Sequence, residues 1–344
     1  MKIGLLTGGG DAPGLNAAIR AVGRRALLGG DSLAGIRNGW AGLLGDGDIE
    51  PMDRPMFSGI LQLGGTVLGS SRVNPIKREG GLEEVLRNID RQGLEALVAI
   101  GGDDTLSVAA WLADRGAHVV GVPKTMDNDL MVTEYCIGFD SAVSVVAEAL
   151  DRLHTTAMSH HRVMVLEVMG RDTGWVGVMG GLAGGADMII IPEFPVTVDE
   201  VIEHLDKRSA AGSDFSIIVV TEGVEMEGLR GKDDAGEKRD AFGHVQLGRR
   251  GVGETLARII EERTGHETRA TVLGHLQRGG SPSAYDRIWA TRVGAAAYDL
   301  VRGNRWGMMP VVQCGAVEIA RIADVVAEPR RVPRDLYELA QVFY

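Results

Sequence analysis

The sequence predicts an α/β protein with mainly parallel sheets, and three observations support this fold class. Short apolar segments typical of buried strands alternate with segments whose apolar residues recur at helical spacing. The strand-like segments end in glycine, proline or carboxylates, and ligands bind beyond the carboxyl ends of strands in an open parallel sheet. The 49 glycines fall in short clusters at these ends without a repeat, which favours ligand-binding turns over a fibrous chain.

Length, charge and cysteine content restrict the class of protein. A chain of 344 residues suggests two domains or one large α/β unit. The net charge of -11 argues against a nucleic-acid or acidic-membrane partner, which would be repelled. Cys136 and Cys314 belong to no metal-binding or redox pattern and are expected to be buried, reduced thiols. No apolar run is long enough for a membrane span, and the amino terminus lacks the apolar region of a signal peptide, so a cytoplasmic location is predicted.

The first strand–turn–helix segment is a candidate anion site. Lys2 to Thr7 is the predicted strand, three glycines ending at Gly10 follow, and Pro13 is expected in the first turn of the next helix. Such a turn lets backbone N–H groups approach a phosphate, and the helix dipole favours the negative charge. Glycine-rich turns are also common in proteins that bind nothing there, so the turn alone is weak support. The helix stripe that would face the sheet consists of Leu15, Ile19, Val22 and Ala26.

Further elements alternate along the chain. Asp140 or Ser141 is expected to cap the helix that begins near Phe139. The segment 64–78 is a polar loop that is either solvated or a cationic arm on a phosphate chain, and 225–248 is predicted to be a solvated loop. The arginine- and proline-rich carboxyl terminus is expected to be a surface tail. Strands are predicted at 33–36, 94–100, 118–122, 162–168, 188–191 and 215–221, and helices at 82–91, 106–112, 139–157, 256–262 and 284–301.

Two adjacent strand ends carry most of the candidate chemistry. Asp103 and Asp104 follow one strand, and neighbouring carboxylates raise each other's pKa unless a cation lies between them. A magnesium ion bound to a phosphate chain is a suitable cation, although helix capping could explain one of the two. After the next strand, Asp127 or Asp129 could accept a proton from a sugar hydroxyl, and Lys124 could neutralise phosphoryl oxygens. Turn carboxylates often only accept local hydrogen bonds, which is the alternative.

A third group of candidates is cationic. Arg269, His275 and Arg278 lie near glycines in RATVLGHLQRGGSPSAYDR, and guanidinium groups match phosphate oxygens. Arg162 and Arg171 are further cations at strand ends. A single arginine is most often a surface residue, but this set in an acidic protein indicates a local anion pocket.

These motifs resemble the phosphofructokinase family. Six segments occur in the family order over about the first 290 residues: TGGGDAPGLNAAIR, GGDDT, PKTMDND, MGRDTGW, TEG and RATVLGHLQRGGSPSAYDR, which we call the arginine-to-arginine signature. The resemblance implies two similar three-layer α/β/α domains with an active site in the cleft between them. Residues 1–138 and 252–303 would form the larger, phosphoryl-donor and magnesium domain. Residues 139–251 and 304–344 would form the smaller, sugar-phosphate domain and the carboxyl-terminal tail.

The resemblance also implies residue roles. Asp103 would hold Mg²⁺, and Asp127 would be the general base on the sugar 1-hydroxyl. Arg162 and Arg269 would reach the sugar phosphate from a neighbouring subunit, which implies a homodimer or homotetramer with shared active sites. Gly10 and Arg72 would contact the donor, Thr125 and Asp129 would assist the base, and Arg171 would stabilise the transition state. Fructose 6-phosphate would be bound by Thr125, Asp127, Met169, Gly170, Arg171, Glu222, His275 and Arg278.

Two side chains concern the phosphoryl donor. ATP-dependent members of the family generally have glycine at the positions of Asp104 and Lys124, where a carboxylate would meet the nucleotide's α-phosphate. The pair resembles the pyrophosphate-dependent branch, although lysine alone occurs in some ATP users. The expected reaction is reversible transfer from pyrophosphate to fructose 6-phosphate, releasing phosphate, with Mg²⁺. An ATP-dependent enzyme is the main alternative, and a nucleotide kinase such as an NAD kinase and a catalytically silent sugar-phosphate sensor are two further ones.

Overall fold

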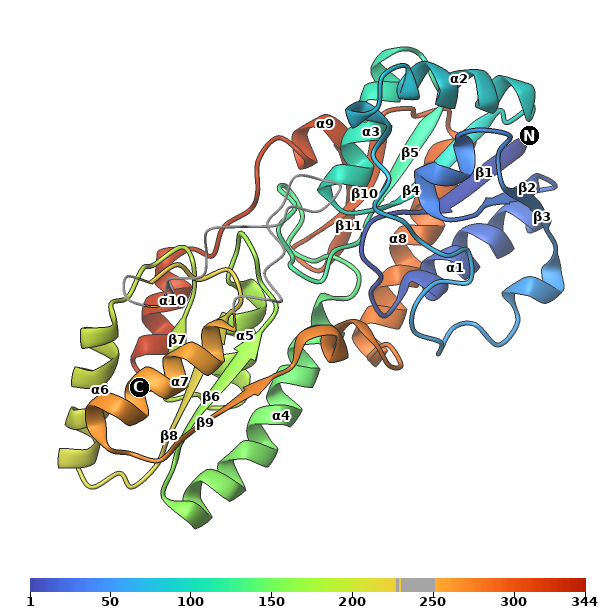
Figure 1. Ribbon diagram of the computed structural model, residues 1–344. Helices are drawn as coiled ribbons and strands as arrows, with labels where there is room; N and C mark the ends of the chain where they lie inside the picture. The colour runs from blue at the N-terminus through green and yellow to red at the C-terminus, as the bar shows by residue number, and fades with distance from the viewer. Residues whose placement is uncertain (227–228, 230–250) are drawn as a thin grey trace. The chain divides into compact units, whose positions relative to one another are not determined.

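The computed structural model describes residues 1–226, 229 and 251–344. This part of the chain forms two compact units, each built on its own sheet (Figure 1). Unit 1 comprises residues 1–141 and 278–329, and unit 2 comprises residues 142–226, 229, 251–277 and 330–344. Most of the predicted solvated loop at 225–248 lies outside the described residues. None of the helices in the described ranges is long and apolar enough to cross a membrane.

Unit 1 contains a seven-stranded sheet in the order β11-β10-β5-β4-β1-β2-β3. The five central strands pair in parallel, whereas β3 and β11 pair antiparallel at the two edges. The prediction of a mainly parallel sheet is therefore confirmed. The strands are β1 (Lys2–Thr7), β2 (Ser32–Ile36), β3 (Ile49–Met52), β4 (Ala96–Gly101), β5 (Val119–Pro123), β10 (Met308–Gln313) and β11 (Ala316–Arg321).

The register of unit 1 brings three strand ends to one edge. Thr7 of β1 lies beside Ile100 of β4, and Gly101 of β4 lies beside Pro123 of β5. The glycine turn, the Asp103–Asp104 pair and the Lys124 segment therefore leave the sheet side by side, as expected for the carboxyl edge of a parallel sheet.

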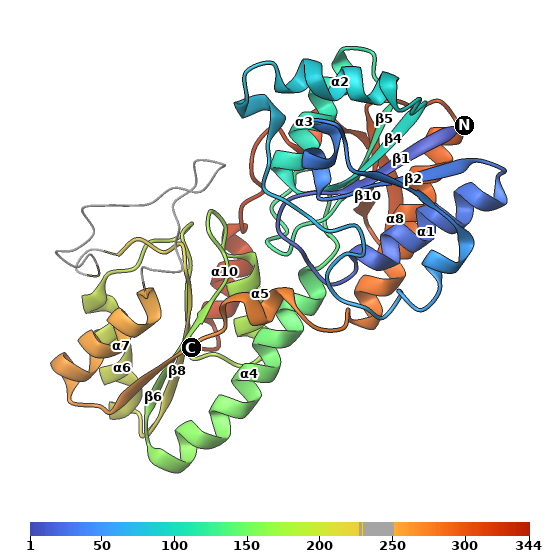
Figure 2. The ribbon, with the colours of Figure 1, turned by 45° about the vertical axis from the view of Figure 1, so that its right-hand side comes forward.

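Helices cover both faces of this sheet, which gives three layers (Figure 2). On one face, α1 and α8 approach closely, since a Cβ on Gly294 would lie 2.9 Å from the Ala18 carbonyl oxygen. On the other face, α2, α3 and α9 share a core with the strands. The helices are α1 (Leu15–Leu28), α2 (Gly81–Arg91), α3 (Asp103–Asp114), α8 (Ala284–Arg302) and α9 (Ile322–Val325), with 3-10 helices η1 (Gly39–Leu43), η2 (Arg54–Phe57) and η3 (Pro75–Lys77).

Unit 2 is a smaller version of the same architecture. Its four strands are all parallel in the order β7-β8-β6-β9. Helices α6 and α7 share one core with the sheet, and α4 packs on α5, where Cβ atoms on Gly180 and Gly184 would meet Val146 and Leu150. The elements are β6 (Val163–Val168), β7 (Met188–Ile190), β8 (Ser216–Thr221), β9 (Thr268–Val272), α4 (Phe139–His160), α5 (Trp175–Ala183), α6 (Val198–Ala210), α7 (Val252–Thr264), η5 (Gly274–Arg278) and α10 (Arg334–Gln341).

The predicted domain boundaries differ from the structure in two segments. Residues 252–277 lie in unit 2, because β9 pairs with β6 and α7 packs on the same sheet. Residues 304–329 lie in unit 1, because β10 pairs with β5. The carboxyl terminus is not a surface tail: Tyr337 is buried in unit 2, and its hydroxyl donates to the Ile189 carbonyl oxygen at 3.0 Å.

Three local predictions are also wrong. The first helix begins at Leu15 after Gly14, whose φ of 106° requires the left-handed region, so Pro13 precedes the helix. Asp140 and Ser141 lie inside the first turn of α4 and do not precede it as caps. Cys136 is buried, but Cys314 is exposed. The apolar stripe of α1 is confirmed, since all four predicted positions are buried.

Candidate active site

The glycine turn after β1 lies beside an arginine of unit 1. The Gly8 N–H donates to the Ile100 carbonyl oxygen at 3.0 Å, which fixes the turn against β4. A Cβ on Gly10 would lie 2.6 Å from the Nη1 atom of Arg278. The same Nη1 donates to the Asp11 carbonyl oxygen at 3.1 Å. Glycine at this position therefore leaves room for a guanidinium group directly against the turn.

The polar loop at 64–78 is bound to the same turn. The Gly9 N–H donates to the Ser71 carbonyl oxygen at 3.1 Å, and the Ser70 hydroxyl donates to the Gly9 carbonyl oxygen at 2.5 Å. The Thr7 hydroxyl donates to the Gly69 carbonyl oxygen at 2.9 Å. Arg72 is an exposed member of this loop. Of the two alternatives for the loop, these contacts favour the arm at the donor site, and the contact of Arg72 with a donor stays a prediction.

Asp103 and Asp104 are the first two residues of α3, and Gly102 is its N-cap. Neither carboxylate is at the cap position, so the capping alternative does not explain the pair. The positive end of the helix dipole favours both negative charges in this first turn. The side-chain amide of Asn74 donates to Asp104 Oδ1 at 3.2 Å, so one of the two carboxylates contacts the 64–78 loop.

Lys124 is a buried cation at the same edge, only 3% exposed. Its Nζ donates to the Gly10 carbonyl oxygen at 2.6 Å. Burial, followed by the nearby Arg278, lowers the pKa of Lys124 from 10.5 to about 8. Asp127, Asp103 and Asp11 partly oppose this by favouring the ammonium form. Lys124 is therefore still mostly charged at neutral pH.

The segment after Lys124 is held by its own side chains. Asn128 has a φ of 52°, its amide donates to the Glu134 carbonyl oxygen at 3.1 Å, and its Oδ1 accepts from the Cys136 N–H at 2.9 Å. Asn tolerates this left-handed conformation better than most residues do. The segment therefore has a defined shape, with Asp127 and Asp129 on either side of Asn128.

The carboxyl group of Asp129 is buried among negative charges. Burial, followed by the negative charges of Asp127 and Asp103, raises the pKa of Asp129 to about 7. Its Oδ1 atom is buried and accepts no hydrogen bond. A divalent cation at this oxygen would relieve both the repulsion and the missing contact.

The described residues fit magnesium better than a metal bound by protein alone. Across residues 1–226, 229 and 251–344, no group of three or more histidine, cysteine or carboxylate side chains could hold a metal ion. Mg²⁺ is usually bound by one or two carboxylates together with waters and substrate phosphates. The carboxylates that mutually repel here, Asp103 and Asp129, supply such a partial set.

A residue without a predicted role, Asp286, holds the end of this segment. Its carboxylate is fully buried and accepts hydrogen bonds from the Tyr135 hydroxyl, the Gly138 N–H at 2.6 Å, and the Ser141 N–H and hydroxyl at 2.9 and 2.5 Å. Asp286 therefore links α8 to the residues around the start of α4. The available signal was its position in the arginine-to-arginine signature, but no local pattern assigns it a function.

Three of the predicted sugar-binding residues, Met169, Gly170 and Glu222, lie at the carboxyl ends of β6 and β8 in unit 2. The Glu222 N–H donates to the Val168 carbonyl oxygen at 2.9 Å, and the Gly223 N–H donates to that of Gly170 at 3.0 Å. The Met169 N–H donates to the buried side chain of Gln277 at 2.8 Å. The segment that follows Met169 contains Arg171, and η5 contains His275 together with Gln277.

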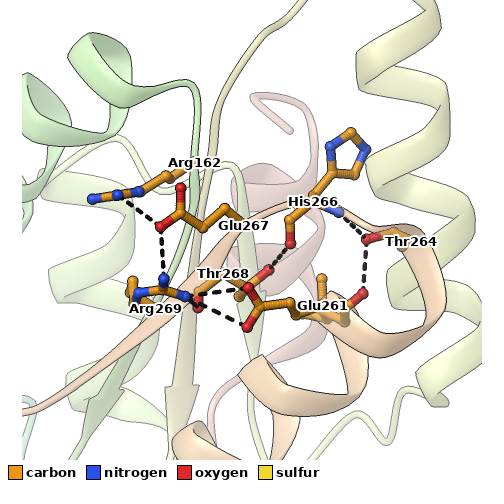
Figure 3. Close-up of polar contacts among 8 residues, drawn as sticks. Arg162, Glu261, Thr264, His266, Glu267, Thr268 and Arg269 are labelled. Carbon is orange, nitrogen blue, oxygen red and sulfur yellow. Dashed lines mark hydrogen bonds and ion pairs between the residues drawn. The ribbon is translucent and has the colours of Figure 1, made fainter.

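Arg162 and Arg269 lie at the opposite edge of the same sheet. Arg162 immediately precedes β6, and Arg269 pairs with Met164 near the start of β9. Figure 3 shows Glu267 between them, with its Oε1 at 2.7 Å from Arg162 Nη2 and 2.6 Å from Arg269 Nη2. Arg162, followed by Arg269, lowers the pKa of Glu267. Arg269 therefore lies at the opposite end of β9 from η5, which contains both His275 and Arg278.

The sequence and the fold resemble those of known proteins. The family pattern "Phosphofructokinase" matches residues 2–301. The pyrophosphate–fructose 6-phosphate 1-phosphotransferase of Amycolatopsis methanolica is 52% identical over 345 residues and 100% of both chains. The ATP-dependent 6-phosphofructokinase 3 of Streptomyces coelicolor is 45% identical over 99% of both chains. A crystal structure of a pyrophosphate-dependent phosphofructokinase from Marinobacter aquaeolei shares the fold, with a TM-score of 0.83 at 24% identity over 99% of this chain and 91% of that one. The chain belongs to the phosphofructokinase family.

Proposed function

We propose that this protein transfers a phosphoryl group reversibly from pyrophosphate to the 1-hydroxyl of fructose 6-phosphate, forming fructose 1,6-bisphosphate and phosphate. Family membership supports the sugar substrate and the reaction. Three relatives at 50 to 52% identity carry the pyrophosphate name, whereas two ATP-dependent relatives are 45 and 42% identical, so overall similarity also supports pyrophosphate as the donor. The observation that carries the donor assignment is the presence of both Asp104 and Lys124 at the carboxyl edge of the sheet in unit 1.

Asp104 and Lys124 act in opposite ways on the two donors. A carboxylate in the first turn of α3 repels the α-phosphate of a nucleotide, whereas pyrophosphate has no such group. The buried ammonium of Lys124 stabilises the charge that develops on the departing phosphate, an effect typically worth about 3 kcal/mol. Because the phosphoanhydride and the phosphate ester differ less in free energy than ATP and the ester do, the reaction runs in both directions.

The remaining groups of unit 1 have separate tasks. Asp127 accepts the proton of the sugar 1-hydroxyl, and Thr125 orients that segment because its hydroxyl accepts from the Asp127 N–H at 3.1 Å. Asp103 and Asp129 hold Mg²⁺, which when bound neutralises charge on the phosphoryl oxygens. Gly10, Arg72 and Lys124 bind the donor.

The sugar phosphate is bound by unit 2. Met169, Gly170, Glu222 and His275 bind fructose 6-phosphate, and Arg171 stabilises the transition state. Arg162 and Arg269 serve the site of a neighbouring copy, which makes the enzyme a homodimer or homotetramer. In that case, mixing inactive Arg162→Ala and Asp127→Ser chains restores part of the activity, whereas independent sites give none. A cytoplasmic location stays a prediction.

The donor is tested by competition. Purified enzyme with Mg²⁺ and saturating fructose 6-phosphate is expected to form the bisphosphate with pyrophosphate and to show little or no turnover with ATP. Asp127→Ser should abolish turnover while sugar binding persists. Turnover with ATP alone would assign the protein to the ATP-dependent members of the family. Activity on NAD with either donor would instead indicate a nucleotide kinase.

A further inference from the structure

Asn74 connects the two parts of the donor side in unit 1. Its side-chain NH₂ group donates to Asp104 Oδ1 at 3.2 Å. Its Oδ1 accepts from the Ile76 N–H at 2.9 Å and so caps the short helix η3. Because the Ile76 N–H requires an acceptor, the oxygen must face Ile76 and the NH₂ group must face Asp104. The orientation of the amide is therefore fixed by the backbone.

The segment that carries Asn74 is anchored at its other end to the glycine turn. Ser70 and Ser71 both bond to Gly9, at 2.5 and 3.1 Å, and the Ser71 hydroxyl donates to the Asn38 carbonyl oxygen at 2.7 Å. Residues 70–74 thus run from the proposed phosphate turn to the carboxylate of Asp104. Because the backbone of this segment is bonded to the glycine turn, a side chain at position 74 can hold that carboxylate in one position.

The contact also affects the rotamer of Asp104. Asp104 is only partly buried, so its neighbours in the helix do not restrict its rotamer completely. A carboxylate that repels a nucleotide must not rotate away when the nucleotide enters, and the hydrogen bond from Asn74 opposes that rotation.

We propose that Asn74 is a positioning residue for donor selection, which holds the Asp104 carboxylate in the orientation that excludes a nucleotide. This rests on the proposed use of pyrophosphate. Asn74 contacts neither substrate in this role and acts only through Asp104.

The test uses Asn74→Ser, because serine caps a helix as well as asparagine does but is too short to reach Asp104. The measured quantity is donor preference, taken as the inhibition constant of ATP against pyrophosphate divided by the KM for pyrophosphate. Loss of one hydrogen bond should lower this ratio about fivefold. The KM for fructose 6-phosphate should not change, because the Asn74 side chain bonds to Asp104 and Ile76, and neither is assigned to sugar binding.

The matched control repeats the substitution in an Asp104→Gly background. There Asn74→Ser should leave the ratio unchanged, because the group that it positions is absent. An equal fall in both backgrounds, or no fall in the wild-type background, would overturn the proposal. If Asn74→Ser melts at a lower temperature than the wild type, Asn74→Gln, which keeps the amide, provides a second comparison. A donor-preference ratio for Asn74→Gln as low as that of Asn74→Ser would also contradict the proposal. Failure of the pyrophosphate assignment would be visible separately, as absence of pyrophosphate turnover in the unmodified enzyme.

Discussion

Replacing Lys124 with methionine should stabilise the protein while removing its activity with pyrophosphate. Lys124 is 3% exposed, and its pKa is lowered from 10.5 to about 8. A shift of this size means that the ammonium form costs about 3 kcal/mol of folding free energy at about pH 7. Methionine has a similar length and carries no charge, but it loses the hydrogen bond to the Gly10 carbonyl oxygen, worth about 1 kcal/mol. The net gain in unfolding free energy should be about 2 kcal/mol.

The sign of the pH dependence provides a second check. The folded-state pKa of Lys124 lies below the unfolded value, so the unfolded chain binds more protons between about 8 and 10.5. The stability of the wild-type protein therefore rises through this window, and the contribution is absent in the variant. The advantage of Lys124→Met should shrink from about 2 kcal/mol near pH 7 to about zero near pH 10.

Urea unfolding of both proteins at the two pH values measures this difference. The exposed Lys77 of the same unit, replaced by methionine, is the control for removing a lysine charge in general. If Lys124→Met is less stable than the wild type near pH 7, the burial argument is wrong. If its advantage does not narrow at higher pH, the gain comes from packing and not from the charge. Retained turnover with pyrophosphate would refute the proposed role of the ammonium group.

Three other predictions concern the same unit. Gly10→Ala should lower kcat/KM for the donor at least about tenfold with little change in melting temperature, because its Cβ displaces only the flexible end of Arg278; an unfolded variant would contradict this. At a pH above about 7, where the Asp129 carboxyl group is ionised, added Mg²⁺ should raise the melting temperature of the wild type more than that of Asp129→Asn. Equal increases in the two proteins would exclude Asp129 as a ligand. Asp286→Asn should lower the free energy of unfolding, measured with a chemical denaturant, by about 2 kcal/mol. The amide NH₂ group of asparagine would face another donor, such as the Tyr135 hydroxyl, and could not accept its hydrogen bond. A loss below about 0.5 kcal/mol would mean that the buried contacts contribute little.

The interior strands other than β10 could be predicted from the sequence because both of their faces are buried. β4 is an unbroken apolar run with every residue buried, so local composition suffices. The edge strand β9 was missed because only its first residue is fully buried, and its sequence TRATV has no apolar run. β10 contains a proline, and β11 contains no fully buried residue, so neither resembles an interior strand.

The errors in domain boundaries follow from these missed strands. A segment belongs to the unit whose sheet it joins, and that pairing depends on contacts between residues far apart in sequence, such as Met308 with Val120. The carboxyl terminus was assigned to the surface because it is rich in arginine and proline. Its buried residues, Val332, Tyr337 and Ala340, are separated by charged residues, so no apolar run marks the segment as buried. Whether these few side chains are buried depends on the surface of unit 2 against which they pack.

The candidate site was predictable where strand ends carry the chemistry. Asp103, Asp104 and Lys124 follow parallel strands directly, so topology alone brings them to one edge. Asn74 and Asp286 could not be assigned in the same way. Asn74 lies in a loop without periodicity, and the partners of Asp286 come from a segment about 150 positions earlier in the chain.

The geometry of unit 2 gives the strongest physical reason for an oligomer. Arg162 precedes β6 and Met169 follows it, and a strand of six residues spans about 20 Å. An arginine side chain cannot bridge that length, so one phosphate cannot be held at both edges of the same sheet. If both edges bind sugar phosphate, as the family resemblance implies, each edge must serve a different site. The Glu267 carboxylate pairs with both Arg162 and Arg269, so the two guanidinium groups converge on one point, as the proposed contact with a phosphate bound to another copy requires.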